Sequence, residues 1–134
     1  MLKARAGPEA IILGLTNTNV ARLLSDQPIK FCLSELGHPP KTMGICHGNA
    51  EVLYTIGLPS THKAPVTAEL GNGTFLLVLP DAALDKLVSG KPIQLDVSAA
   101  GLLVKALAVI HGLTEKAIAH SLGTKADMET VGSC

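Results

Sequence analysis

The residues best suited to chemistry in this sequence form a short motif, His-Gly-x-x-Glu, that occurs twice. The two copies are His47, Gly48 and Glu51, and His111, Gly112 and Glu115. In each copy an apolar run precedes the motif and a helical pattern follows it, so we expect each histidine where a strand leads into a helix N-terminus. A histidine at such a place could act as an acid or base, ligate a metal or bind a ligand.

The motif also has a purely structural interpretation, which the residue types favour. Glycine suits a sharp turn from strand to helix, and glutamate in a first helical turn complements the helix dipole. Two histidines and two glutamates brought around one cavity would suit Zn²⁺ or Mn²⁺. We treat the six residues as candidate ligand-binding residues, and we predict no catalytic residue, no metal and no other cofactor.

The cysteines do not add a recognisable metal or disulfide pattern. Cys32, His38, Cys46 and His47 lie in the first half of the chain, but their spacing matches no common zinc motif. Three cysteines without regular spacing do not indicate a disulfide framework. Because the first residues also lack the apolar core of a signal peptide, we expect reduced thiols and a cytoplasmic protein.

Composition excludes several classes of function. The chain has 134 residues, of which 47% are hydrophobic and 16% charged, and its formal net charge is +0. Such a chain folds, but it lacks the basic surface and the aromatic residues that nucleic-acid binding requires. The longest apolar run, residues 102–110, is interrupted by Lys105 and is too short to span a membrane.

An internal duplication is the main signal in the sequence. Residues 2–51 align without a gap on residues 66–115, at an offset of 64, and 14 of the 50 aligned positions are identical. Average composition would give about 3 identities by chance. The matched pairs include Pro-Ile at 28–29 and 92–93 and His-Gly at 47–48 and 111–112.

Each copy has the pattern of two strands, a helix, two strands and a helix. The expected strands are residues 2–6, 10–15, 28–34 and 42–46, and their counterparts at 66–70, 74–79, 92–98 and 106–110. Asn17 and Asp81 occupy matched positions typical of helix N-caps. The second helix of each copy is expected at 50–56 and 115–122.

We therefore expect one globular α+β domain over residues 1–134. Its parts are copy one (1–56), a linker (57–65), copy two (66–122) and a tail (123–134). The two ββαββα copies should pack with pseudo-twofold symmetry as a two-layer α/β sandwich. The alternative is a small closed barrel of two interlocked ββαβ halves.

The pattern favours a non-enzymatic binding or protein-interaction module, with a protein partner or a small ligand and with homo-oligomers as an option. A surface of Leu102, Leu103 and Val104 would be a contact region if exposed. One alternative is a small enzyme or metal-binding protein that uses the duplicated histidine motif. The other is a structural self-assembling subunit whose free strand edges pair. Neither nucleic acid nor a membrane is an expected partner.

Overall fold

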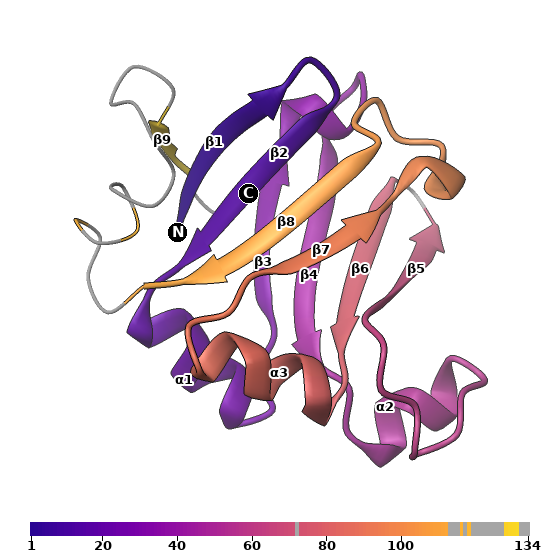
Figure 1. Ribbon diagram of the computed structural model, residues 1–134. Coiled ribbons are helices and arrows are strands. Elements are labelled where there is room, and N and C mark those ends of the chain that lie inside the picture. Colours follow the sequence, from indigo (N-terminus) through magenta and orange to yellow (C-terminus); the bar gives the residue numbers. More distant parts are fainter. Residues whose placement is uncertain (72, 113–115, 117, 119–127, 132–134) are drawn as a thin grey trace.

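The computed structural model describes residues 1–71, 73–112, 116, 118 and 128–131, and these residues form two mixed β-sheets with short helices (Figure 1). The α+β class is therefore confirmed. Neither sheet closes on itself within the described residues, so the alternative of a closed barrel is wrong.

Sheet A contains strands from both ends of the chain. Its strands are β1 (Leu2–Gly7), β2 (Ala10–Leu15), β7 (Ile93–Asp96), β8 (Ala106–His111) and β9 (Met128–Thr130), in the order β7-β8-β2-β1-β9. The β2–β8 pair is parallel, and the other pairs are antiparallel. The short strand β9 was not expected from the sequence.

Sheet B takes its strands from the middle of the chain. They are β3 (Ile29–Leu33), β4 (Lys41–His47), β5 (Val66–Gly71) and β6 (Thr74–Leu79), in the order β3-β4-β6-β5. Here β4 and β6 are the parallel pair. Apart from β9, each sheet thus has two strands from residues 2–47 and two from residues 66–111.

The strand registers of the two sheets agree at the offset found in the sequence. In sheet A, Leu15 lies opposite His111, and in sheet B, Leu79 lies opposite His47. The β1–β2 pair likewise repeats as β5–β6, with a bulge at the matched place, and β3–β4 repeats as β7–β8. The ungapped alignment of the sequence therefore corresponds to equivalent positions in space.

The main hydrophobic core lies between the two sheets. It joins inward side chains of both, such as Leu13, Phe31 and Leu77, with residues of α1 (Asn17–Leu24) and α3 (Asp81–Val88). Figure 1 shows α1 and α3 at one end of the crossing sheets, where they cover the core. This arrangement differs from the predicted layers of helices on one sheet, because the inward faces of both sheets are apolar.

The two core helices begin at Asn17 and Asp81 themselves, so their N-caps lie one residue before the predicted ones. Thr16 caps α1, with its hydroxyl accepting from the Asn19 backbone N–H at 3.3 Å and the Asn19 side chain accepting from the Thr16 backbone N–H at 3.0 Å. Pro80 precedes α3 at the matched place and offers no side-chain cap. The prediction that Asn17 and Asp81 are the caps is wrong, and both side chains bind elsewhere.

The remaining elements are short. They are α2 (Ala50–Thr55) and two 3-10 turns, η1 (Ser34–Leu36) and η2 (Ser98–Ala100). Of the three residues proposed as a contact region, Leu102 and Val104 are buried and Leu103 alone is exposed, so they do not form an apolar surface. Apart from Lys116 and Ile118, the predicted helix 115–122 lies outside the described residues, as does most of the tail.

Candidate functional site

His47, at the end of β4, is held between two aspartates. Its Nδ1 atom lies 2.6 Å from Asp26 Oδ1, and its Nε2 atom lies 2.6 Å from Asp81 Oδ1. Asp26 follows α1 in a left-handed conformation (φ 59°), and Asp81 is the first residue of α3. Because a carboxylate only accepts hydrogen bonds, a ring that bonds both must donate from both nitrogens, as the imidazolium does.

His111 occupies the equivalent place at the end of β8, with neutral partners. Its Nε2 atom lies 2.7 Å from Asn17 Oδ1, and its Nδ1 atom lies 3.1 Å from the Leu87 carbonyl oxygen. Asn17 is the sequence counterpart of Asp81. An amide can present its nitrogen as well as its oxygen, so a neutral imidazole can make both bonds. The two copies therefore share a geometry and differ in the charge of the groups that the ring contacts.

The surroundings of His47 raise its pKa. Burial of the ring by itself lowers this pKa, but the hydrogen bonds and charges of Asp81 and Asp26 outweigh burial, and the net shift is upward from 6.5. The ring is 16% exposed, whereas the Asp81 side chain is 86% exposed. Water therefore screens the attraction between His47 and the two aspartates, and these ion pairs stabilise the fold only moderately.

The glycines after the two histidines are required by close packing. A Cβ atom on Gly48 would lie 2.7 Å from Val78 Cγ1, and one on Gly112 would lie 2.3 Å from Ile118 Cγ1. The Gly48 N–H donates to the Leu79 carbonyl at 2.7 Å. The structural interpretation of glycine in the motif is therefore supported, although the reason is crowding rather than an unusual backbone conformation.

The glutamates of the motif are not part of the described histidine contacts. Glu51 is an exposed residue in the first turn of α2, where Asn49 is the N-cap. Glu115 lies outside the described residues. Sequence reasoning missed Asp26, whose counterpart is Gly90, and it assigned Asp81 and Asn17 to caps. Asn17 and Asp81 occupy the same aligned position, and its polar character in both copies was the one sequence feature that could have indicated the histidine contacts.

The described residues contain no group of three or more histidine, cysteine, aspartate or glutamate side chains arranged to hold a metal ion. His38 is exposed. Cys46 is a free thiol whose pKa is raised by burial. Cys32 is disulfide-bonded, so the expectation of reduced thiols is wrong for this residue.

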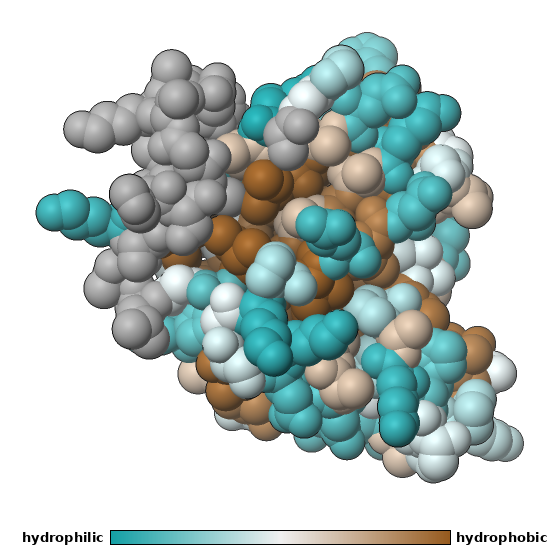
Figure 2. Space-filling view, in the orientation of Figure 1, coloured by the Kyte–Doolittle hydropathy of each residue, from teal (hydrophilic) through white to brown (hydrophobic). Residues whose placement is uncertain are grey.

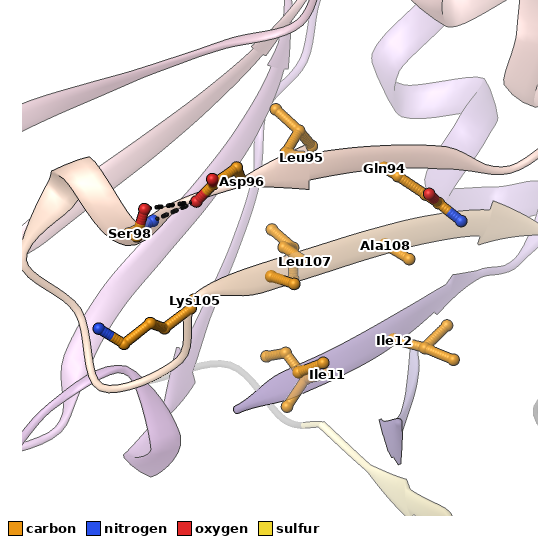
Figure 3. A pocket seen from close by; sticks show the side chains of 11 residues that line it. Ile11, Ile12, Gln94, Leu95, Asp96, Ser98, Lys105, Leu107 and Ala108 are labelled. Atoms are coloured by element: carbon orange, nitrogen blue, oxygen red, sulfur yellow. Dashed lines mark hydrogen bonds between the residues drawn. The ribbon is translucent and has the colours of Figure 1, made fainter. Parts of the chain in front are cut away.

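A hollow of about 630 Å³ lies on the outer face of sheet A. Its floor leaves space because three small side chains, Ala10, Ala106 and Ala108, lie side by side on β2 and β8. Figure 3 shows Ile12, Ala108 and Gln94 in a row across β2, β8 and β7. Figure 2 shows hydrophobic residues gathered in the middle of this face and polar residues around them.

One rim of the hollow is polar. Asp96 Oδ1 accepts from the Ser98 hydroxyl at 2.6 Å and from the Ser98 backbone N–H at 2.9 Å, which together with the charge of Lys105 lowers the Asp96 pKa. Lys105, exposed at the start of β8, lines the same rim. The hollow thus combines an aliphatic floor with a few oriented polar groups, as small-ligand sites do.

The equivalent place on sheet B is filled by a side chain. The counterparts of Ala108 and Ile12 are Gly44 and Leu76, and Leu76 Cδ1 lies 3.2 Å from where a Cβ atom of Gly44 would stand. Leu76 therefore covers the glycine. The counterparts of Ala10 and Ala106 are Thr74 and Thr42, which are larger. Divergence of these side chains, rather than of the backbone, leaves the hollow on one sheet.

Comparisons of this chain with protein families, with curated proteins and with solved structures find no match. In the part of the chain that the structure describes, no helix has the length and apolar character needed to cross a membrane.

The histidine positions are poorly arranged for acid–base catalysis. A catalytic imidazole needs one nitrogen within hydrogen-bond reach of a substrate. Both nitrogens of His47 already bond carboxylates, and both nitrogens of His111 bond groups of α1 and α3. Each histidine instead links the end of one strand to α3 and to a second residue, which is Asn17 of α1 for His111 and Asp26, just after α1, for His47.

We expect the stability conferred by His47 to fall as pH rises. Below pH 6.5 the ring is protonated in the folded and the unfolded state, so its charged bonds contribute in full. Above the raised pKa it is neutral in both states, and the contribution is lost. Urea unfolding of His47→Gln should show a loss of about 0.5–1 kcal/mol at pH 6 that shrinks by about pH 8.5.

The matched control is His111→Gln. Because no carboxylate bonds its ring, the difference between this variant and the wild type should change less between the two pH values. If His47→Gln lowered the free energy of unfolding equally at both pH values, a charged interaction of His47 with the aspartates would be contradicted.

Proposed function

We propose that this protein is a non-enzymatic binding or interaction module whose binding site is the hollow on the outer face of sheet A. The observation that carries this proposal is the hollow itself, with its alanine floor, the flanking Ile12 and the polar rim of Gln94, Asp96 and Lys105. Its volume of about 630 Å³ falls within the range of small-ligand sites. A compact aliphatic ligand, or an aliphatic side chain of a protein partner, suits this floor.

The contacts of the two histidines support a binding role over an enzymatic one. The most reactive groups of the duplicated motif are used to join strands to helices, and the hollow on sheet A contains neither histidine. The polar groups lining the hollow are the types that orient a ligand, namely an amide, a carboxylate, a hydroxyl and an ammonium group.

The presence of the hollow on sheet A alone can be explained by duplication followed by divergence of one copy. We infer that residues 2–51 and 66–115 descend from one duplicated unit that interlocks with pseudo-twofold symmetry, as two subunits of a dimer would. The equal registers of both sheets support this inference. A duplicated chain can change one copy alone, and the alanines of sheet A against the threonines and Leu76 of sheet B fit such a specialisation. We also propose a cytoplasmic location, in which the disulfide of Cys32 would be unusual.

Filling the hollow tests the proposed site. We expect Ala10→Leu to weaken binding of the apolar dye anilinonaphthalene sulfonate by about tenfold or more, because the added side chain would occupy the floor. Native mass spectrometry of freshly purified wild-type protein should also show an added small molecule that Ala10→Leu lacks.

The matched control is Thr74→Leu, which introduces the same side chain at the counterpart position on sheet B. It should leave dye binding unchanged. Equal dye binding by the wild type and Ala10→Leu, together with no retained molecule, would remove the hollow as the binding site.

A further inference from the structure

Strand β5 lies at the edge of sheet B, whereas its counterpart in sheet A, β1, is covered by another strand. In sheet A, β1 has two neighbours, β2 on one side and β9 on the other. Its counterpart β5 pairs with β6 and has no second neighbour among the described residues. An edge strand presents unpaired N–H and C=O groups that favour the addition of another strand.

The burial of the two strands differs accordingly. Leu2, Lys3 and Ala4 of β1 are buried, and these are the three residues that pair with β9. Their counterparts in β5 are Val66, Thr67 and Ala68, each of which is half-exposed. The same backbone geometry thus accepts a third strand in one sheet and leaves the matching groups accessible in the other.

Among the residues that the structure describes, no segment is placed to cover β5. Moved back by 64 positions, β9 would correspond to residues 64–66, but Pro65 leads directly into β5 and Val66 is the first residue of that strand. The residues that correspond to β9 therefore overlap the start of β5 itself and cannot pair with it. The described part of the chain thus supplies no covering strand for β5, and a second molecule can supply one.

We propose that β5 pairs antiparallel with β5 of a second copy of this chain. The register that the residues favour is centred on Thr67, which places Thr67 opposite Thr67 of the partner subunit and Val66 opposite Ala68 of the partner subunit. Facing threonines are a favourable cross-strand pair. A register centred on Glu69 would place two carboxylates opposite each other, which is unfavourable.

The bulge in β5 sets the length of this contact. The register of β5 on β6 shifts between Glu69 and Gly71, as that of β1 on β2 shifts between Arg5 and Gly7. In β1 the added strand stops before the bulge, at Ala4. The β5 contact should likewise extend over residues 66–68. So short a contact buries little area, and the dimer is therefore a weak, reversible one.

Sedimentation equilibrium across a concentration series tests the pairing. We expect the wild type to shift from monomer towards dimer between about 0.01 and 1 mM. Thr67→Lys places two ammonium groups opposite each other and should weaken association about fivefold. The position tolerates the side chain in copy one, where Lys3 is its counterpart.

Glu69→Lys is the matched control, since it introduces the same side chain on the same face of β5 beyond the paired residues. It should leave association unchanged. Should Thr67→Lys fail to fold, Thr67→Cys provides a second measurement. Under mild oxidation it should form covalent dimers faster than Glu69→Cys or the wild type, because facing residues bring their Cβ atoms within disulfide reach.

A wild type that stays monomeric at about 1 mM overturns the proposal. So does a dimer that is unaffected by Thr67→Lys and is not trapped by Thr67→Cys. Because β5 lies in sheet B and the hollow in sheet A, either result leaves the proposed binding site untouched.

Discussion

Replacing Lys3 by methionine should lower the free energy of unfolding by about 3 kcal/mol. Lys3 is 7% exposed, and within the described residues it is the one buried charged side chain. Its ammonium group bonds Glu35 Oε1, so β1 of sheet A is tied to the η1 turn that follows β3 of sheet B. Methionine keeps the aliphatic stem but leaves the Glu35 carboxylate, which is 17% exposed, without its partner. Equilibrium urea unfolding at pH 7 measures the loss.

The double variant Lys3→Met/Glu35→Leu is the control for this prediction. Removing both charges removes the unpaired carboxylate, so the double variant should be more stable than Lys3→Met alone. If the double variant loses as much as the sum of the two single variants, the ion pair is not what holds the two sheets together.

The same pair gives the wild type an acid dependence. Burial by itself raises the pKa of Glu35, but the hydrogen bond and charge of Lys3, together with local hydrogen bonds, lower it below its ordinary value of 4.5. A carboxyl group with a lowered folded-state pKa contributes its stability above the ordinary value, and that stability is lost as pH falls through the lowered one. The advantage of the wild type over Lys3→Met should therefore shrink below about pH 4.5.

Gly48→Ala should cost about 2 kcal/mol, because the added methyl group has no space. Its Cβ atom would meet Val78 Cγ1 at 2.7 Å and both Leu53 Cδ2 and the Pro80 nitrogen at 3.3 Å. The Pro80 nitrogen is backbone and cannot move independently, so the turn after β4 must shift. Thermal unfolding followed by circular dichroism, with a urea titration for the free energy, measures the loss.

Gly44→Ala, in the same strand, is the matched control. Its Cβ atom would meet only the end of the Leu76 side chain at 3.2 Å and the Ile29 carbonyl oxygen at 3.7 Å, and the leucine can turn away. The control should lose less than half as much stability as Gly48→Ala. Equal losses would show that glycine in this strand is needed for a reason other than crowding at the turn.

A displaced turn should also move His47, the neighbour of Gly48. One ring nitrogen bonds Asp26, just after α1, and the other bonds Asp81 on α3, so a shift of the strand end cannot keep both distances at 2.6 Å. Gly48→Ala should therefore also reduce the pH dependence that His47 gives to the wild type. The His-Gly pair of each copy then joins the end of a strand to the helical segments beside it, and only in copy one are the ring's partners carboxylates.

The sequence by itself predicted the order of elements and their equivalence. Periodicity of apolar residues identified β1 to β8, with strand ends within two residues, and α1 to α3, because the alternation of a strand and the spacing of a helix are local properties. The offset of 64 predicted matched positions that the structure places at matched registers. It also located His47 and His111 at strand ends, although it did not supply their partners.

The pairing of strands and the partners of the side chains were decided by the tertiary structure. Parallel pairing of β2 with β8 joins residues 96 positions apart, and Asn17 meets His111 across 94 positions. No local pattern carries such contacts, since they depend on how two sheets close around one core. The hollow likewise exists because the pairing of β2 with β8 places Ala10, Ala106 and Ala108 side by side, next to β7. In the sequence, each of these alanines indicates only a small residue within a strand.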